Sequence, residues 1–231
     1  SEKKETEELI WRQANFDTLT QLPNRSMFHH KLVLEIEQAK QNGSMFALLF
    51  IDLDLFKEIN DTLGHPVGDL LLVEAAQRIS ACVRKSDMVA RLGGDEFTVI
   101  LTDQHMDEGI GRVAEKILAS LAAPYKLKDE VVYVTGSIGI TLYPQDAEDP
   151  EGLLKNADQA MYVAKNMGRN QISYFTQALQ QSAQTRLRMI NDLREAITDQ
   201  QFVLHYQPIV DLRTGEIHKA EAPVRWHHPK N

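Results

Sequence analysis

The sequence has little of several features that define large classes of protein. Cys82 is the only cysteine in 231 residues, so no disulfide can form within the chain and a reducing compartment fits. The longest apolar run, Met45–Ile51, is far too short to cross a bilayer. The charged segment Ser1–Glu5 does not resemble a secretory signal. We therefore expect a cytoplasmic globular domain, while membrane association of a longer parent protein stays open.

Positive charge is also in short supply. The chain has 25 Lys and Arg against 33 Asp and Glu, which gives a net charge of −8. Such a chain is a poor candidate for wrapping nucleic acid, so we expect no nucleic-acid partner. The same charge repels a nucleoside triphosphate at long range. A site for one would need a divalent cation and locally clustered basic residues.

Apolar periodicity and turn residues predict an ordered series of elements. A first helix covers 2–14, and a second, capped by Ser26, covers 27–41. The elements expected after these are a strand at 45–53, helices at 56–63 and 67–83, hairpin arms at 88–92 and 97–101, a helix at 107–121, a strand at 131–142, a helix at 150–167 and a strand at 172–175. The order predicts an α+β fold, a ferredoxin-like antiparallel sheet with helices on one face.

The last part of the chain has a different pattern. Apolar residues three or four apart predict a helix over 176–199, and strands are expected at 202–210 and 221–226. We therefore expect three segments. Residues 1–14 form either a solvated helix or the end of a signalling coiled coil, 15–175 form the main domain, and 176–231 form a linker helix with part of a further domain.

Acidic side chains stand at two predicted strand ends. Gly93 and Gly94 allow a close backbone approach to a ligand because they lack a Cβ, and Asp95 and Glu96 follow at once. Upstream, Asp52 ends a buried strand. Each acid could be a simple turn or cap residue. Brought side by side in one sheet, however, such carboxylates suit metal-assisted phosphoryl transfer.

The string Gly93-Gly94-Asp95-Glu96-Phe97 resembles the signature of the GGDEF domains, the diguanylate cyclases. The resemblance runs from about Asn15 to about Phe175 and includes the opening stretch Asp17–Arg25. It implies a fold akin to the polymerase palm and the adenylyl cyclases. It also implies a reaction, in which two GTP become cyclic di-GMP and two pyrophosphates with Mg²⁺ or Mn²⁺. Two domains would face each other, so a homodimer is expected.

The resemblance implies roles for individual residues around the metal and phosphates. Asp52, the carbonyl of Leu53 and Asp95 would hold the cation, and Asp54 is a further candidate. Asp95 would also be the general base, with Glu96 as an accessory group. The expected phosphate contacts are Phe56, Lys57, Lys165 and Arg169. On the residues alone, Lys57 could simply be solvated, and the last two could pair with a helix C-terminus.

Two further sets are implied. Asn60 and Asp69 match the guanine-reading pair, since an amide and a carboxylate can satisfy the donor and acceptor edge of guanine. His65 belongs with them or only caps the following helix. Arg84 and Asp87 match an inhibitory site for cyclic di-GMP, although Arg-x-x-Asp is a weak pattern that helix ends often carry.

The tail resembles the opening of an EAL domain, a phosphodiesterase of cyclic di-GMP. Glu221 matches a metal ligand there, but the motif reads Glu-Ala-Pro, and Pro223 removes a backbone donor. Further acidic ligands of such a site would lie beyond Asn231, so we expect no phosphodiesterase activity from this chain. An upstream sensor domain and a downstream EAL domain are expected in the parent protein.

Two rival functions stay open at this point. One is a catalytically silent module that binds GTP or cyclic di-GMP and controls an attached phosphodiesterase. The other is a general polymerase palm, which the lack of a basic track for nucleic acid disfavours. The complete set of motif residues favours the cyclase.

Overall fold

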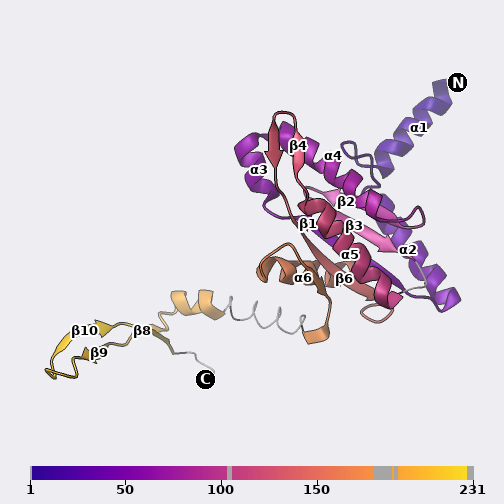
Figure 1. Ribbon diagram of the computed structural model, residues 1–231. Helices are drawn as coiled ribbons and strands as arrows, with labels where there is room; N and C mark the ends of the chain where they lie inside the picture. The colour runs from indigo at the N-terminus through magenta and orange to yellow at the C-terminus, as the bar shows by residue number, and fades with distance from the viewer. Residues whose placement is uncertain (1, 103–105, 179–188, 190–191, 228–231) are drawn as a thin grey trace. The chain divides into compact units, whose positions relative to one another are not determined.

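The computed structural model describes residues 2–102, 106–178, 189 and 192–227. The chain divides into two compact units, Ser1–Gln180 and Gln181–Asn231. The first unit holds a five-stranded sheet in the order β2-β3-β1-β6-β7 (Figure 1). Its strands are β1 (Phe46–Leu53), β2 (Met88–Gly93), β3 (Glu96–Leu101), β6 (Gly136–Tyr143) and β7 (Ile172–Tyr174).

Strand β1 is the centre of this sheet. It pairs antiparallel with β3 on one side and with β6 on the other. The edge strand β7 is parallel to β6, so the sheet is mixed and not wholly antiparallel. A separate small hairpin is formed by β4 (Tyr125–Leu127) and β5 (Glu130–Val132). The strand expected over 131–142 is therefore split between β5 and β6.

Helices cover both faces of the sheet. The helices of this unit are α1 (Glu2–Asn15), α2 (Arg25–Asn42), α3 (Phe56–Leu63), α4 (His65–Cys82), α5 (Met106–Ala122) and α6 (Pro150–Asn166). Leu49 and Ile51 of β1 belong to a core shared with α4 and α5, whereas Leu48 and Phe50 belong to a second core shared with α2 and α6. The expectation of helices on one face was wrong. Every residue of β1 is buried, as a strand covered on both sides requires.

Two helix starts differ from the sequence expectation. Helix α2 is capped by Asn24, whose Oδ1 accepts a hydrogen bond from the Met27 amide at 3.1 Å, and not by Ser26. Helix α4 begins at His65, two residues early, because Pro66 can occupy the first turn without needing a backbone donor. Gly64 is its N-cap residue, and no side chain caps this end. The expectation that His65 caps the helix is not met.

The described part of the second unit contains two short antiparallel pairs and a helical segment. Strand β9 (Gln207–Val210) pairs with β10 (Ile217–Glu221), and β8 (Phe202–Leu204) pairs with β11 (Val224–Trp226). Of the helix expected over 176–199, residues 192–198 are helical, while 179–188 and 190–191 lie outside the described residues. Within the described ranges, no helix of either unit has the length and apolar character needed to span a bilayer.

Candidate active site

The acidic end of β1 forms the centre of the candidate site. Asp52 stands opposite Glu96 of β3 and Ser137 of β6. Since side chains alternate along a strand, Asp52 shares the face of Leu48 and Phe50, which is the face that α6 covers. Lys165 in the last turn of α6 places its Nζ 2.7 Å from Asp52 Oδ1. Residues 113 positions apart in the sequence thus meet at one point.

The charged form of the Asp52 carboxylate is poorly stabilised in this structure. It is 6% exposed, and its Oδ1 accepts no directed hydrogen bond from a described residue despite the short ion pair. Burial raises the pKa of Asp52 to about 6; the Lys165 ammonium lowers it, and the nearby Asp95 carboxylate raises it further. A second positive charge beside Asp52 would therefore be stabilising.

The hairpin between β2 and β3 brings Asp95 to the same place. Gly93 and Gly94 have φ values of +144° and +52°, which glycine adopts without a steric penalty. The turn sets the carbonyl of Asp95 3.3 Å from the amide of Leu53, at the end of β1. Asp95 is half-buried and close enough to raise the pKa of both Asp52 and Glu96. The structure thus brings together the two acidic strand ends that the sequence singled out.

Glu96 lies in a wider group of charges that includes two residues the sequence analysis missed. Burial raises the pKa of Glu96, Arg25 at 3.8 Å lowers it, and Asp158 raises it. Burial also raises the pKa of Asp158, which Lys165 lowers. Asp158 precedes Lys165 by seven residues on α6, so the two share a helix face, and that spacing could have revealed it. Lys165 is therefore the cation shared by three carboxyl groups.

The hairpin is clasped to the segment before α2. The Arg91 guanidinium donates from Nη1 to both carboxylate oxygens of Asp17, at 3.0 and 2.9 Å. It also donates from Nε and Nη2 to the Gly94 carbonyl, at 3.0 and 2.7 Å. Burial would raise the pKa of Asp17, but hydrogen bonds from Thr20 and Arg91 bring it below its ordinary value. No local pattern could have predicted this contact, because 74 residues separate its partners.

Helix α3 begins directly after the acidic strand. Leu55 at its N-cap has a φ of +60°, a rare conformation for a branched side chain. Phe56 is buried and Lys57 is exposed. Among the described residues, no side chain caps α3, and the Glu58 amide donates to the Leu55 carbonyl at 3.0 Å. The amides of Phe56 and Lys57 at this helix start can donate to an anion.

The predicted guanine-reading residues lie where α3 meets α4. Asn60 Oδ1 is buried and has no hydrogen-bond partner among the described residues. It presses against Gly68, where a Cβ would lie only 1.9 Å from Oδ1. Asp69 and His65 are exposed in the first turn or so of α4. A buried amide without a partner is unusual, and a ligand edge would satisfy it.

The turn after α6 carries Arg169, which is exposed and has a φ of +66°. Its neighbour Asn170 donates its backbone N–H to Asp54 Oδ2 at 3.1 Å. Asp54 is 3% exposed and its oxygens also accept from Thr135 and Ser137. Its oxygens are thus directed at the protein itself, unlike those of Asp52.

The remaining predicted residues are Arg84, Asp87 and Glu221. Asp87 closes the turn between α4 and β2, where its carboxylate accepts from the amides of Arg84 at 2.9 Å and Thr102 at 3.4 Å. Arg84 itself is exposed. Glu221 ends β10 in the second unit and is exposed. Pro223 lies between β10 and β11 and accepts a hydrogen bond from the His205 amide, so it does not interrupt a strand.

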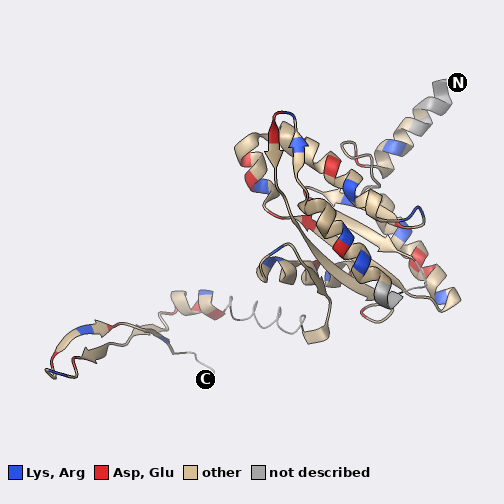
Figure 2. Cartoon of the chain, viewed as in Figure 1, with Lys and Arg blue, Asp and Glu red and all other residues tan. Residues whose placement is uncertain are grey.

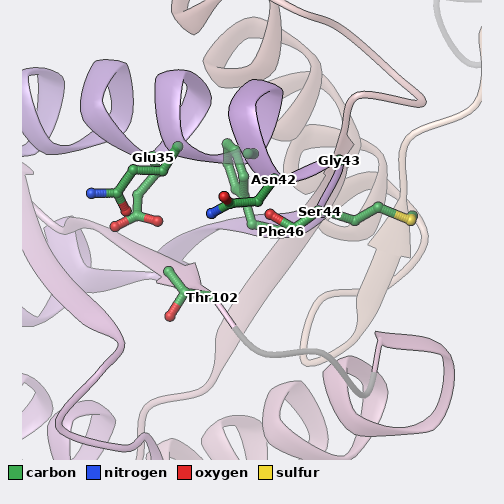
Figure 3. A pocket seen from close by; sticks show the side chains of 9 residues that line it. Glu35, Asn42, Gly43, Ser44, Phe46 and Thr102 are labelled. Carbon is green, nitrogen blue, oxygen red and sulfur yellow. The ribbon is translucent and has the colours of Figure 1, made fainter.

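Two hollows lie near the ends of β1. A groove of about 690 Å³ borders Asp54 and Leu55, between α3 and residues 130–135. At the opposite end of β1, a cavity of about 660 Å³ is lined by the end of α2, Phe46 and Thr102 (Figure 3). Glu35 reaches into that cavity and is ion-paired with Lys31. None of the predicted site residues lines it.

The acidic end of β1 fits a divalent cation. In the described ranges, no group of three or more His, Cys, Asp and Glu side chains is arranged around a metal position. A cation here would instead use Asp52, Asp95 and the Leu53 carbonyl. Mg²⁺ accepts such a set, because it binds one or two carboxylates and completes its shell with water and phosphate oxygens. The buried Oδ1 of Asp52, short of hydrogen bonds, is the observation that supports this fit.

The fold and the site define a class of α/β domain in which two acidic strand ends meet at the end of the central strand. Comparison with known proteins agrees. The family model "Diguanylate cyclase, GGDEF domain" matches residues 14–171, and the EAL domain model matches 190–231. The chain belongs to the GGDEF family and continues into an EAL segment.

Relatives and solved structures extend the comparison. The chain is 44% identical over 218 residues to the bifunctional diguanylate cyclase/cyclic di-GMP phosphodiesterase MucR of Pseudomonas aeruginosa, covering 94% of this chain and 32% of MucR. It is 48% identical over 158 residues to the diguanylate cyclase TpbB of the same species, covering 68% of this chain and 36% of TpbB. The chain thus spans about a third of the length of the curated relatives it matches.

Among solved structures, the GGDEF domain of Pseudomonas aeruginosa TpbB matches with a TM-score of 0.71 and 44% identity, covering 73% of this chain and 99% of that one. The coiled coil and GGDEF domain of Caulobacter crescentus DgcB, solved in complex with c-di-GMP, matches with a TM-score of 0.68 and 27% identity. That match covers 75% of this chain and 92% of the solved chain. Both are structures to which this chain is similar.

Proposed function

We propose that this chain is a diguanylate cyclase, which condenses two GTP into cyclic di-GMP and releases two pyrophosphates. The observation that carries the proposal is the meeting of Asp52, Asp95 and Lys165 at the end of β1, beside the GGDEF hairpin. Family membership and the named activity of relatives such as TpbB support it.

The residues divide the chemistry among them. Asp52, Asp95 and the Leu53 carbonyl would hold Mg²⁺ or Mn²⁺, which supplies Lewis-acid stabilisation of the attacking oxygen. Asp95 accepts the proton of the 3′-hydroxyl of one GTP, with Glu96 as an accessory acid. That oxygen bonds to the α-phosphorus of the second GTP as the bond to pyrophosphate breaks. A second, reciprocal attack closes the ring.

The phosphates would be held by backbone amides and basic side chains. The open first turn of α3 offers amides at Phe56 and Lys57, and since the Phe56 side chain is buried, its contribution comes from the backbone. Lys57, Lys165 and Arg169 offset the charge that develops on the phosphates. In this structure Lys165 is paired with Asp52, and a bound nucleotide would offer its ammonium a phosphate partner.

The guanine base would be read by Asn60 and Asp69, with His65 nearby. The buried Asn60 Oδ1, without a partner, supports this assignment, because a guanine N–H would satisfy it. Adenine lacks the donor edge that Asp69 would accept from. The site should therefore select GTP over ATP.

Regulation and partners complete the proposal. Each domain holds one GTP, so two copies must face each other, at least transiently. Arg84 and Asp87 would bind cyclic di-GMP as a feedback inhibitor; the solved neighbour DgcB is in complex with c-di-GMP. Because the chain spans about a third of its relatives, we expect an upstream sensor before 1–14 and the rest of an EAL domain after 176–231.

A silent regulatory module is the second candidate. It is favoured by one observation, that a relative 42% identical over 218 residues is named only as the cyclic di-GMP phosphodiesterase NbdA. The intact set of acids and basic residues around Asp52 and Asp95 favours the cyclase.

Incubation with Mg²⁺ and GTP, followed by separation of the nucleotides, decides between the two. We expect cyclic di-GMP and pyrophosphate, with a specific activity that rises with protein concentration across the dimerisation range. The Asp95→Asn variant is the control and should bind GTP without converting it. Wild-type protein that binds GTP and leaves it unchanged would identify the silent module instead.

A further inference from the structure

Asp54 holds three separate parts of the fold together. Its Oδ2 accepts from Thr135 Oγ1 at 2.6 Å and from the Asn170 amide at 3.1 Å, and its Oδ1 accepts from Ser137 Oγ at 2.7 Å. Its own amide donates to the Thr135 carbonyl at 2.8 Å. The residue is 3% exposed. A buried carboxylate with this many donors is built into the structure as an anchor.

The turn that Asp54 anchors is strained. Gly168, Arg169 and Asn170 all have positive φ, at +121°, +66° and +47°. For Arg169 this conformation costs on the order of 1 kcal/mol and persists only where surrounding contacts fix it, whereas asparagine tolerates it more readily. The contacts here are the Arg169 amide on the Ala164 carbonyl at 3.1 Å and the Asn170 amide on Asp54.

The anchored turn and the end of β1 carry different parts of the proposed site. Asp54 is two residues beyond Asp52, and the turn follows directly on the last turn of α6, which carries Lys165. The Cα atom of Arg169 lies between the two hydrogen-bonded amides, its own and that of Asn170. A change in the anchor would therefore move Arg169 relative to the acidic end of β1, without changing any residue that touches the nucleotide.

We infer that Asp54 is a positioning residue that fixes the Gly168–Asn170 turn to the metal-binding end of β1, and so sets where Arg169 meets the phosphates. This inference rests on the proposed function, since it assigns the use of the turn. It also removes Asp54 from the candidate metal ligands, because both of its oxygens already accept hydrogen bonds from the protein.

The test is the Asp54→Asn variant, with Asp146→Asn as a matched control. Asp146 Oδ2 accepts from the Leu142 amide at 2.7 Å and from Thr141 Oγ1 at 3.3 Å, at the opposite end of β6. Each substitution replaces one acceptor oxygen by an NH₂ group. Binding of GTP and of guanosine, both with Mg²⁺, is measured by calorimetry for all proteins, and the Asn170 amide is followed by NMR.

We expect Asp54→Asn to weaken GTP binding about tenfold, the loss typical of a hydrogen bond to a charged group, and to leave guanosine binding unchanged. The Asn170 amide signal should shift and exchange faster. Asp146→Asn should leave both ligands and that amide unchanged. A general structural defect would instead weaken both ligands alike, and this result would overturn the inference.

A milder variant covers the case in which Asp54→Asn does not fold. Thr135→Val keeps the branched shape and removes the hydroxyl donor to the same Oδ2 that accepts from Asn170. It should give the same selective loss of GTP binding, only smaller. Unchanged GTP binding together with a displaced Asn170 amide would refute the positioning role. Wild-type protein that binds GTP no better than guanosine would instead refute the proposed function.

Discussion

At the acidic end of β1, the structure treats two carboxylates in opposite ways. On the side of the β2–β3 hairpin and α6, Asp52 is buried against a single ammonium and its pKa rises to about 6. On the side of β6 and the Gly168–Asn170 turn, Asp54 accepts three hydrogen bonds. The two residues are two positions apart and nearly equally buried, so burial alone does not separate function from structure. What separates them is the supply of donors.

The side with unmet charge is where a ligand gains most by binding. Asp52, Asp95, Glu96 and Asp158 share few cations, and a metal or basic group added there relieves repulsion. Across the first unit, by contrast, Lys and Arg are interspersed with Asp and Glu along the helices (Figure 2). Local imbalance, and not net charge, marks the site.

The strongest test of this comparison removes a charge from the hairpin side. Asp95→Ala should lower turnover at least about a hundredfold, because it removes the proposed base and a metal ligand together. Product formation from Mg²⁺ and GTP measures the effect, and Glu130→Ala, an exposed acid on β5, is the control. Turnover that survives in Asp95→Ala would remove the hairpin from the chemistry.

The second test uses stability in the absence of metal. The folded-state pKa of Asp52 lies above its ordinary 3.8, so folding favours the protonated form. The stabilisation from Asp52 is present below about pH 4 and is lost as the pH rises through about 6. At pH 7.5, Asp52→Asn should therefore stabilise the metal-free fold by up to about 3 kcal/mol.

Thermal melting between pH 5 and 8 measures this effect. The gain from Asp52→Asn should shrink steadily as the pH is lowered through 6. A gain that is the same at every pH, or a loss at pH 7.5, would contradict the picture of an unsatisfied carboxylate.

The third test makes the same substitution at Asp54, two residues further along the chain. Asp54→Asn should destabilise the fold by about 2 kcal/mol, since it disrupts hydrogen bonds to a charged acceptor. Chemical denaturation of the metal-free protein measures it. Opposite signs for Asp52→Asn and Asp54→Asn at pH 7.5 are the sharpest form of the comparison, and equal signs would break it.

The smallest expected effect concerns the support of the hairpin. Arg91→Lys keeps the charge but cannot bond both Asp17 oxygens and the Gly94 carbonyl at once. We expect turnover to fall several-fold, corresponding to about 1 kcal/mol, with little change in GTP affinity. Steady-state kinetics separate the effect on turnover from the effect on GTP affinity. A change in affinity alone would show that Arg91 acts on substrate binding and not on the position of the hairpin.

The sequence predicts the elements that carry the site well. The expected strand at 45–53 and helix at 56–63 agree closely with β1 and α3, because an uninterrupted apolar run followed by polar residues has a clear pattern. The same run already implied cover on both faces, which the expectation of helices on one face overlooked. The split at 131–142 was missed, because β-branched residues continue through the break between β5 and β6.

Contacts between residues far apart in the sequence could not be predicted. The Arg91–Asp17 clasp and the Asp54–Asn170 bond join residues 74 and 116 apart, and neither has a local pattern. Asp158 was visible in principle from its spacing to Lys165. The assignment of Asp54 needed the three donors that only the folded chain brings to it.

The register of β1 determines which way its acidic side chain points. The strand is buried along its whole length and flanked by partners in register on both sides. Slipping it by a single residue would turn Asp52 from the α6 face toward α4 and α5. The packing of the apolar interior therefore fixes the strand register, and the register positions the carboxylates. A substitution that repacks the core at Leu49 would therefore displace the acidic side chains before it unfolded the domain.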